Sequence, residues 1–168
     1  DNGDNWAQIN NGLTGLYPVS FVINSLDHIF TGTFLGDGIF RSTNGGSNWT
    51  QMNNGLIATE VRTLKFNSTN YLFAGTYGTG MFRSADFGEN WNALNNGLTA
   101  AYFTSIAFNS IDQIFAGADF IDGAGGVFRS TDNGENWTEV NQGVITTDVR
   151  AIAINSNNDI FAGTYFGG

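Results

Sequence analysis

The residues best suited to chemistry in this 168-residue chain are aromatic rings, carboxylates and two arginines that recur at matching positions. Alignment of the four Asn-Ser pairs that begin at residues 24, 67, 109 and 155 brings most of them into common columns. Aromatic rings stack on the apolar faces of sugars and carboxylates accept hydrogen bonds from hydroxyl groups, so the set predicts a carbohydrate or protein ligand. The predicted ligand-binding residues are Tyr17, Phe34, Arg62, Tyr77, Tyr102, Asp119, Asp122, Arg150 and Tyr165.

Two acidic residues of these columns, Glu60 and Asp148, are the candidates for catalysis. A pair of carboxyl groups can hydrolyse a glycosidic bond, one as acid and one as base or nucleophile. Each candidate is also followed two residues later by an arginine, Arg62 or Arg150, with which it can form an ion pair. A purely structural interpretation stays open as well, because rings and carboxylates also fill and solvate turns rich in glycine.

The composition excludes several classes of function. The chain has 6 Lys+Arg against 15 Asp+Glu, a formal net charge of −9, so nucleic acids and anionic membrane surfaces would repel it. No apolar run is long enough to span a membrane. With 0 Cys and 1 His, the chain has no thiolate ligands, no histidine cluster and no cysteine nucleophile. We therefore expect no cofactor, no metal site, and neither a nucleic-acid nor a membrane partner.

The elements that position these residues come from an internal repeat. The four tryptophans, Trp6, Trp49, Trp91 and Trp137, are 43, 42 and 46 residues apart, and the residues before each of them repeat as well. The extra residues of the longest period are rich in glycine and lie at 120–126, after Asp119, where they predict a flexible acidic loop. The repeat predicts one domain, 1–168, divided into a partial unit 1–12, full units 13–54, 55–96 and 97–142, and a partial unit 143–168.

Each full unit is predicted to form four short antiparallel strands. In the third unit they are expected at 103–108, 113–118, 126–130 and 136–141, because these stretches are rich in Ile, Val, Phe and Thr and are bounded by turn residues. The first strand is apolar on both faces and is expected to be the most buried, whereas the fourth is expected near solvent. A repeated unit of about 42 residues with this make-up is typical of an all-β β-propeller blade. The alternative, a β-solenoid, normally has a shorter period.

The segment before each tryptophan resembles the Asp-box of bacterial neuraminidase-type (BNR) repeats, with the pattern Ser-x-Asp-x-Gly-x-x-Trp. The resemblance implies a β-propeller with this turn between strands three and four. An Asx side chain can bond the backbone of its own turn, and the glycine permits a positive φ, so a structural role is expected. The matching residues are Ser42, Asn44, Gly46, Trp49, Ser84, Asp86, Gly88, Trp91, Ser130, Asp132, Gly134 and Trp137.

The resemblance leaves the function open, because such repeats occur in sialidases, xyloglucan-cleaving enzymes, sortilin-type receptors and photosystem II assembly factors. A sialidase of this family needs three converging arginines, and only Arg62 and Arg150 occupy the right column, so sialidase activity is not expected. The favoured hypothesis is a non-enzymatic module of an exported, extracellular or cell-surface bacterial protein that binds carbohydrate or protein. The alternatives are a fragment of a glycoside hydrolase and an assembly scaffold.

The partial units at the two ends raise the question of ring closure. A fourth strand is expected at 5–10, and first and second strands at 149–155 and 159–165, with no third strand to join them. The interpretations are a stretch of a longer repeat array, a ring completed by self-association of several chains, and a four-bladed ring that closes imperfectly. Tyr17 and Tyr102 alternate with Glu60 and Asp148 along one column, which favours an even number of blades.

Overall fold

The computed structural model describes residues 3–14, 17–58, 60–121 and 123–165, and the regular structure of these residues consists of strands alone. Three four-stranded antiparallel sheets are followed by one two-stranded sheet. The strands are β1 (Pro18–Ile23), β2 (Ile29–Thr33), β3 (Ile39–Ser42), β4 (Thr50–Gln51), β5 (Val61–Phe66), β6 (Leu72–Thr76), β7 (Met81–Ser84), β8 (Asn92–Ala93), β9 (Phe103–Phe108), β10 (Ile114–Ile121), β11 (Ala124–Ser130), β12 (Thr138–Glu139), β13 (Val149–Ile154) and β14 (Ile160–Thr164).

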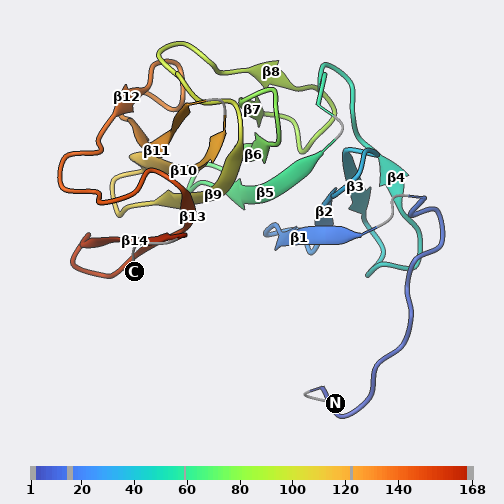
Figure 1. Ribbon diagram of the computed structural model, residues 1–168. Coiled ribbons are helices and arrows are strands. Elements are labelled where there is room, and N and C mark those ends of the chain that lie inside the picture. Colours follow the sequence, from blue (N-terminus) through green and yellow to red (C-terminus); the bar gives the residue numbers. More distant parts are fainter. Residues whose placement is uncertain (1–2, 15–16, 59, 122, 166–168) are drawn as a thin grey trace.

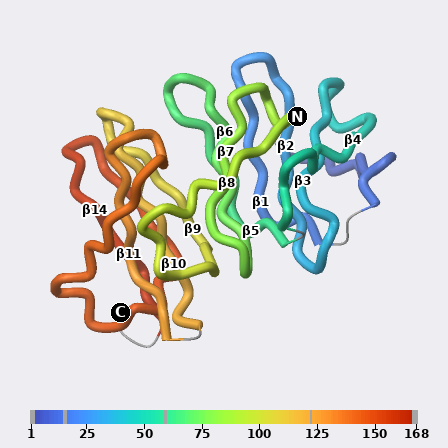
Figure 2. Tube along the Cα trace, turned by 90° about the horizontal axis from the view of Figure 1, so that it is seen from above, coloured from blue at the N-terminus to red at the C-terminus, as the bar shows by residue number. Residues whose placement is uncertain are grey.

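The sheets are the blades of a partial β-propeller, which confirms the predicted fold class. They follow one another in chain order along an open arc, with the N-terminal segment and β14 at opposite ends (Figure 1). Figure 2 shows the same sheets side by side, from β1–β4 to β13–β14. The first strands of successive blades touch, β1 with β5, β5 with β9 and β9 with β13. Among the described residues, no helix is present that could cross a membrane.

The hydrophobic core lies between the blades and is divided into similar compartments. In the first compartment, Phe30 of β2 packs with Val61, Leu64 and Leu72 of the second blade. The ring of Phe30 also meets that of Phe66 edge to face, with centroids 5.4 Å apart. The next compartment repeats this with Phe73 and Phe108, at 5.3 Å. Each blade is therefore stabilised mainly by its two neighbours, as in other repeat proteins.

The predicted order of burial is wrong in one respect, since strand two rather than strand one is the most buried. In the second blade all five residues of β6 are buried, whereas in β5 Lys65 is exposed and Arg62 and Phe66 are half-buried. The reason is the sheet order, which places strand one at an edge and strand two between two ladder partners. In the second and third blades the second strand consequently has a strand on both sides and a neighbouring blade on each face. Strand β14, in a sheet of two strands at the end of the arc, is mostly exposed instead.

The predicted fourth strands are also shorter than expected. The strand expected at 136–141 is reduced to Thr138–Glu139, and residues 5–10 form no strand. A strand needs a ladder partner, and no third strand lies beside 5–10 in the part of the chain that the structure describes. The segment is held instead by Trp49, whose indole N–H donates to the carbonyl of Ile9 at 2.8 Å.

The turn between strands three and four is held by its own side chains. In the third copy, the hydroxyl of Ser130 accepts from Gly134 N–H and the carboxylate of Asp132 accepts from Asn136 N–H, both at 2.9 Å. A second hydrogen bond from the Asn136 side chain helps to lower the pKa of Asp132. Asn44 accepts from Asn48 N–H at 2.9 Å in the first copy, so a neutral side chain makes the same bond to the backbone of this turn.

Candidate functional site

The candidate site is built where strand one begins and strand two ends. In three blades a backbone hydrogen bond joins the residue after strand two to the one before strand one, for example Tyr77 N–H to Glu60 O at 3.0 Å and Tyr165 N–H to Asp148 O at 2.9 Å. In the third blade the equivalent bond runs from Asp119 N–H, within the longer β10, to Tyr102 O at 2.8 Å. The predicted side chains therefore lie together at one end of the blades, and we call them the strand-end row. Asp122 lies outside the described residues. The row comprises Tyr17, Phe34, Glu60, Arg62, Tyr77, Tyr102, Asp119, Asp148, Arg150 and Tyr165.

The first half of the row is a stack of aromatic rings around one arginine. The guanidinium of Arg62 lies over Phe34 of the first blade and over Tyr77 of its own blade, 4.3 and 4.7 Å from the ring centroids. Tyr17 meets Phe34, and Tyr77 meets Tyr102, both edge to face. Such cation–π and edge contacts stabilise neighbouring groups by about 0.5–2 kcal/mol each. These side chains therefore link the first three blades.

The candidate catalytic residue Glu60 is bound in this stack. Its carboxylate lies 2.5 Å from Nε of Arg62, and its side chain is largely buried. The arginine two residues later is therefore its partner, one of the two possibilities that the sequence leaves open. A carboxylate held this way is already paired, so it is poorly placed to donate a proton or to attack a sugar.

The second half of the row is a cluster of two carboxyl groups on one arginine. Arg150 contacts Asp148 through Nε at 2.6 Å and Asp119 through a terminal nitrogen at 2.9 Å. The same guanidinium lies 5.2 Å from the ring centroid of Tyr165. Asp119 comes from the third blade and the other residues from the fourth, so the cluster joins the last two sheets.

Asp119 is only 4% exposed, and this burial is the main cause of its raised pKa. The neighbouring Asp148 favours the protonated form further, and the charge of Arg150 opposes it. Both carboxyl groups contact the one guanidinium of Arg150. Neither is therefore free to act as the separate acid or base that a glycosidase needs.

The raised pKa of Asp119 predicts a pH dependence of stability. In the unfolded chain the group ionises near 3.8, whereas the folded chain holds its proton to higher pH. Its stabilising contribution is therefore complete below 3.8 and is lost as the pH rises through the folded pKa. Compared with Asp119→Asn, which cannot ionise, the wild-type chain should lose free energy of unfolding from pH 4 to pH 7 in urea titrations. Parallel curves for the two proteins would contradict this assignment.

The insertion after Asp119 is a hairpin rather than the flexible loop that its composition predicts. Strand β10 continues to Ile121 and β11 begins at Ala124, with these two residues paired. The register shifts between Ala118 and Ile121, as in a β-bulge. No cluster of three His, Asp or Glu side chains that could hold a metal ion occurs in the described ranges.

A cavity of about 470 Å3 opens beside this hairpin. Its most exposed rings are Phe120 and Tyr165, 53% and 52% exposed. The loop before β13 supplies Ile145, Thr146 and Thr147 to the wall of the cavity, and the sequence analysis did not predict these residues. Ile145 could have indicated the site, because it is an apolar side chain in a segment rich in turn residues. The lining consists of Phe120, Ile145, Thr146, Thr147, Asp148 and Tyr165.

Comparison with known proteins identifies the repeat. The family described as BNR/Asp-box repeat matches residues 128–139, which span β11 from Phe128, the turn and β12. Residues 128–139 are thus an Asp-box repeat, and residues 42–49 and 84–91 repeat the sequence of its turn. This confirms the resemblance found in the sequence. No curated protein matches the sequence of this Asp-box chain.

Solved structures similar to this Asp-box chain are larger propellers. The extracellular domain of a protein described as a one-component system of B. thetaiotaomicron has a TM-score of 0.72 at 16% identity, with 95% of this chain and 22% of that chain covered. The structure of YCF48 bound to D1 peptide has a TM-score of 0.71 at 18% identity, with 96% of this chain and 52% of that chain covered. An ancestral GH74 enzyme has a TM-score of 0.71 at 21% identity, with 94% of this chain and 23% of that chain covered. The chain thus spans between about a fifth and a half of these structures, and the likeness shows the shared fold.

Proposed function

We propose that this chain is a non-enzymatic propeller module that binds a neutral carbohydrate in the cavity between Phe120 and Tyr165. The observation that carries the proposal is that two half-exposed rings, Phe120 and Tyr165, line one cavity together with the polar residues Thr146, Thr147 and Asp148. Rings of this kind bind the apolar faces of a pyranose, and the polar groups bind its hydroxyls. The cavity lies at the largest insertion in the repeat, where the blades differ most.

The charges around the cavity favour a neutral ligand. Arg150 is already paired with both Asp148 and Asp119, so it does not offer a free cation to an acidic sugar. The chain as a whole carries a net charge of −9, which would repel an anion further. Neutral hydroxyl groups can donate to the remaining acceptor sites of Asp148 without this charge repulsion.

The placement of the carboxyl groups supports a binding module over a hydrolase. Glu60 is paired with Arg62, and Asp148 is paired with Arg150. Neither pair leaves a separated acid and base on opposite sides of a sugar. As part of the same proposal, the module acts outside the bacterial cell, in keeping with the absence of cysteine and with the extracellular location named for the B. thetaiotaomicron domain.

The proposal is tested by binding of neutral oligosaccharides to the purified chain. Tyr165→Ala and Phe120→Ala should each weaken the affinity about fivefold to tenfold, because each removes a stacking ring worth about 1–1.4 kcal/mol. Ile111→Ala is the matched control, since Ile111 is also exposed but lies in the turn between β9 and β10, outside the cavity. Its affinity should equal that of the wild-type chain.

Two other outcomes would replace the proposal. Binding of a peptide panel, with no glycan bound and with the same sensitivity to Tyr165→Ala, would show a protein ligand instead, as in the complex of YCF48 with D1 peptide. Release of sugar from an oligosaccharide, abolished by Asp148→Asn or by Glu60→Gln, would show a glycoside hydrolase. Loss of affinity in Ile111→Ala as well would place the glycan elsewhere.

A further inference from the structure

Three of the four tryptophans are core residues and one is not. Trp49, Trp91 and Trp137 are 4–7% exposed, whereas Trp6 is 92% exposed. All four occupy the last position of an Asp-box motif. Since one sequence motif places an indole in the core three times, the environment of Trp6 differs because nothing in the described chain covers it.

Each buried indole docks on the blade that precedes it. The indole N–H of Trp91 donates to Met52 O and its backbone N–H to Asn54 O, both at 2.9 Å. Trp137 makes the same two bonds to Leu94 O and Asn96 O, again at 2.9 Å. The indole of Trp91 shares its core compartment with Phe30 and other residues of the first blade. The Asp-box tryptophan therefore joins one blade to the next.

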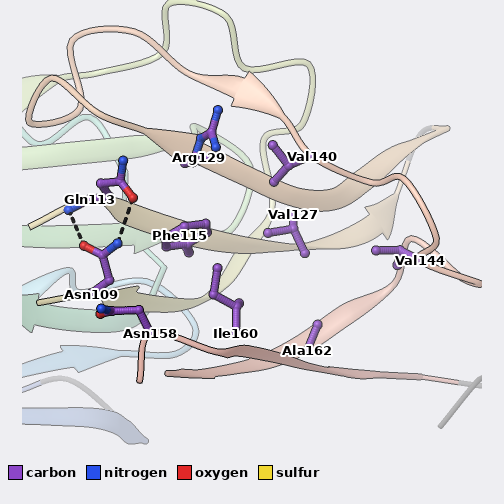
Figure 3. A pocket seen from close by; sticks show the side chains of 10 residues that line it. All are labelled: Asn109, Gln113, Phe115, Val127, Arg129, Val140, Val144, Asn158, Ile160 and Ala162. Atoms are coloured by element: carbon purple, nitrogen blue, oxygen red, sulfur yellow. Dashed lines mark hydrogen bonds between the residues drawn. The ribbon is translucent and has the colours of Figure 1, made fainter. Parts of the chain in front are cut away.

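The third blade carries the same docking surface with no indole in it. A groove of about 490 Å3 lies between this blade and the β13–β14 sheet. Figure 3 shows Phe115, Val127 and Val140 along one side of it, with Ile160 and Ala162 on the other. By the repeat, the first three correspond to Phe30, Ile39 and Met52, which share a compartment with Trp91. The groove is thus an apolar site of the right make-up for an indole.

The charged residues repeat in the same way. Arg41 pairs with Glu89 and Arg83 with Glu135 of the following Asp-box, at 2.9 and 2.8 Å. Arg129 is the third member of this series and lines the groove, and within the described residues no ion pair involves it. The residue of the Trp6 motif that corresponds to the two glutamates is Asp4, which is exposed. The third arginine of the series thus lies in the groove, and the matching anion is two residues before the exposed indole.

We propose that this groove binds the N-terminal Asp-box segment of a second copy of the chain, with Trp6 inserted between the third blade and β14. The Trp6 indole N–H donates to Val140 O, the counterpart of Met52 O and Leu94 O, and Asp4 pairs with Arg129. The contact continues the interface that already joins the blades within one chain. It is heterologous, head to tail, so it forms a ring or an open array depending on its rotation.

The two apolar ends of the arc fit the same contact. Phe161 of β14 is 58% exposed, whereas Phe30 and Phe73, at the same position of the earlier blades, have no exposed surface. At the other end, Phe21 of β1 is exposed, although its counterpart Leu64 is buried. Phe161 belongs to the face that meets the following blade, and Phe21 to the face that meets the preceding one. A head-to-tail second copy covers both.

The first test is binding of a fluorescein-labelled peptide, residues 1–14 of this sequence, to the full chain carrying Trp6→Ala. Fluorescence anisotropy should show saturable binding, and Trp6→Ala in the peptide should weaken it at least tenfold. Arg129→Glu in the chain should weaken the binding of the wild-type peptide. Asp4→Arg in the peptide should restore binding to this variant. Because Arg129 is exposed, this variant is expected to fold, and its circular dichroism spectrum checks that it does.

The second test is the mass of the chain in solution by light scattering. The wild-type chain should show a concentration-dependent mass above 18.1 kDa, and Trp6→Ala should remain a monomer. The proposal is overturned by a wild-type chain that stays monomeric and leaves the peptide unbound, by equal binding of the wild-type and Trp6→Ala peptides, or by no rescue in the charge swap. These readouts do not involve Phe120 or Tyr165, so they are independent of sugar binding.

Discussion

Replacement of Trp91 by alanine is expected to lower the free energy of unfolding by about 3–5 kcal/mol, the usual cost of truncating a buried tryptophan. The indole is buried in the compartment between the first two blades, and its N–H is bonded to Met52 O. The variant would leave a cavity there and a buried carbonyl without its donor, and each of these adds to the loss. Urea denaturation followed by far-UV circular dichroism measures the change without relying on tryptophan fluorescence.

The matched control is Trp6→Ala, which removes the same side chain from the same position of the motif. Trp6 is almost fully exposed, so at low protein concentration, where copies do not associate, its loss should change the free energy of unfolding by no more than about 0.5 kcal/mol. A similar effect of both substitutions would show that the buried indoles do not join one blade to the next.

Replacement of Gly97 by alanine is expected to lower the free energy of unfolding by about 2–5 kcal/mol. Gly97 has a φ of +85°, and a Cβ there would lie 2.2 Å from the backbone oxygen of Trp137. The left-handed conformation costs a residue with a side chain about 1–2 kcal/mol, and forcing the neighbouring blade away adds about 1–3 kcal/mol. Because the obstacle is backbone, a change of side-chain rotamer cannot relieve it. The same urea titration measures the loss.

Gly143 separates these two contributions. It holds the same position in the fourth unit with the same φ of +85°, but no described atom lies within 4 Å of the Cβ that alanine would add. Gly143→Ala should therefore cost only the conformational part, about 1–2 kcal/mol. If Gly97→Ala were no more destabilising than Gly143→Ala, the close approach of the Asp-box tryptophan to the preceding blade would be refuted.

The fold could be predicted from the sequence because its signal is repeated and local. The Trp spacing, the alternating apolar residues and the Asp-box turn each recur within about 42 residues, so every blade supports the assignment of the others. The prediction of a strand at 5–10 was wrong, because strand formation depends on a neighbouring strand rather than on composition alone. The prediction for the burial of strand one was also wrong, because burial depends on the sheet order and not only on the pattern of apolar residues.

The sequence predicts which residues share one end of the blades, but neither their contacts nor the full lining of the cavity. The aligned columns correctly placed residues such as Arg62 and Phe34 at one end of the blades, because the repeat superposes equivalent positions. The link from Arg150 to Asp119 crosses between two blades and 31 positions of sequence, and no local pattern reveals it. The regular hairpin structure of the insertion after Asp119 could not be predicted for the same reason, because it depends on pairing between β10 and β11.

The most direct test of the proposed function is a titration of the 15N-labelled chain with neutral oligosaccharides, followed by two-dimensional NMR. We predict saturable amide shifts confined to the hairpin and loop around the cavity, at Phe120, Thr146, Thr147, Asp148 and Tyr165. Shifts concentrated elsewhere, or no shifts with any neutral sugar while an acidic sugar or a peptide binds, would contradict the claim that this cavity is a site for neutral carbohydrate.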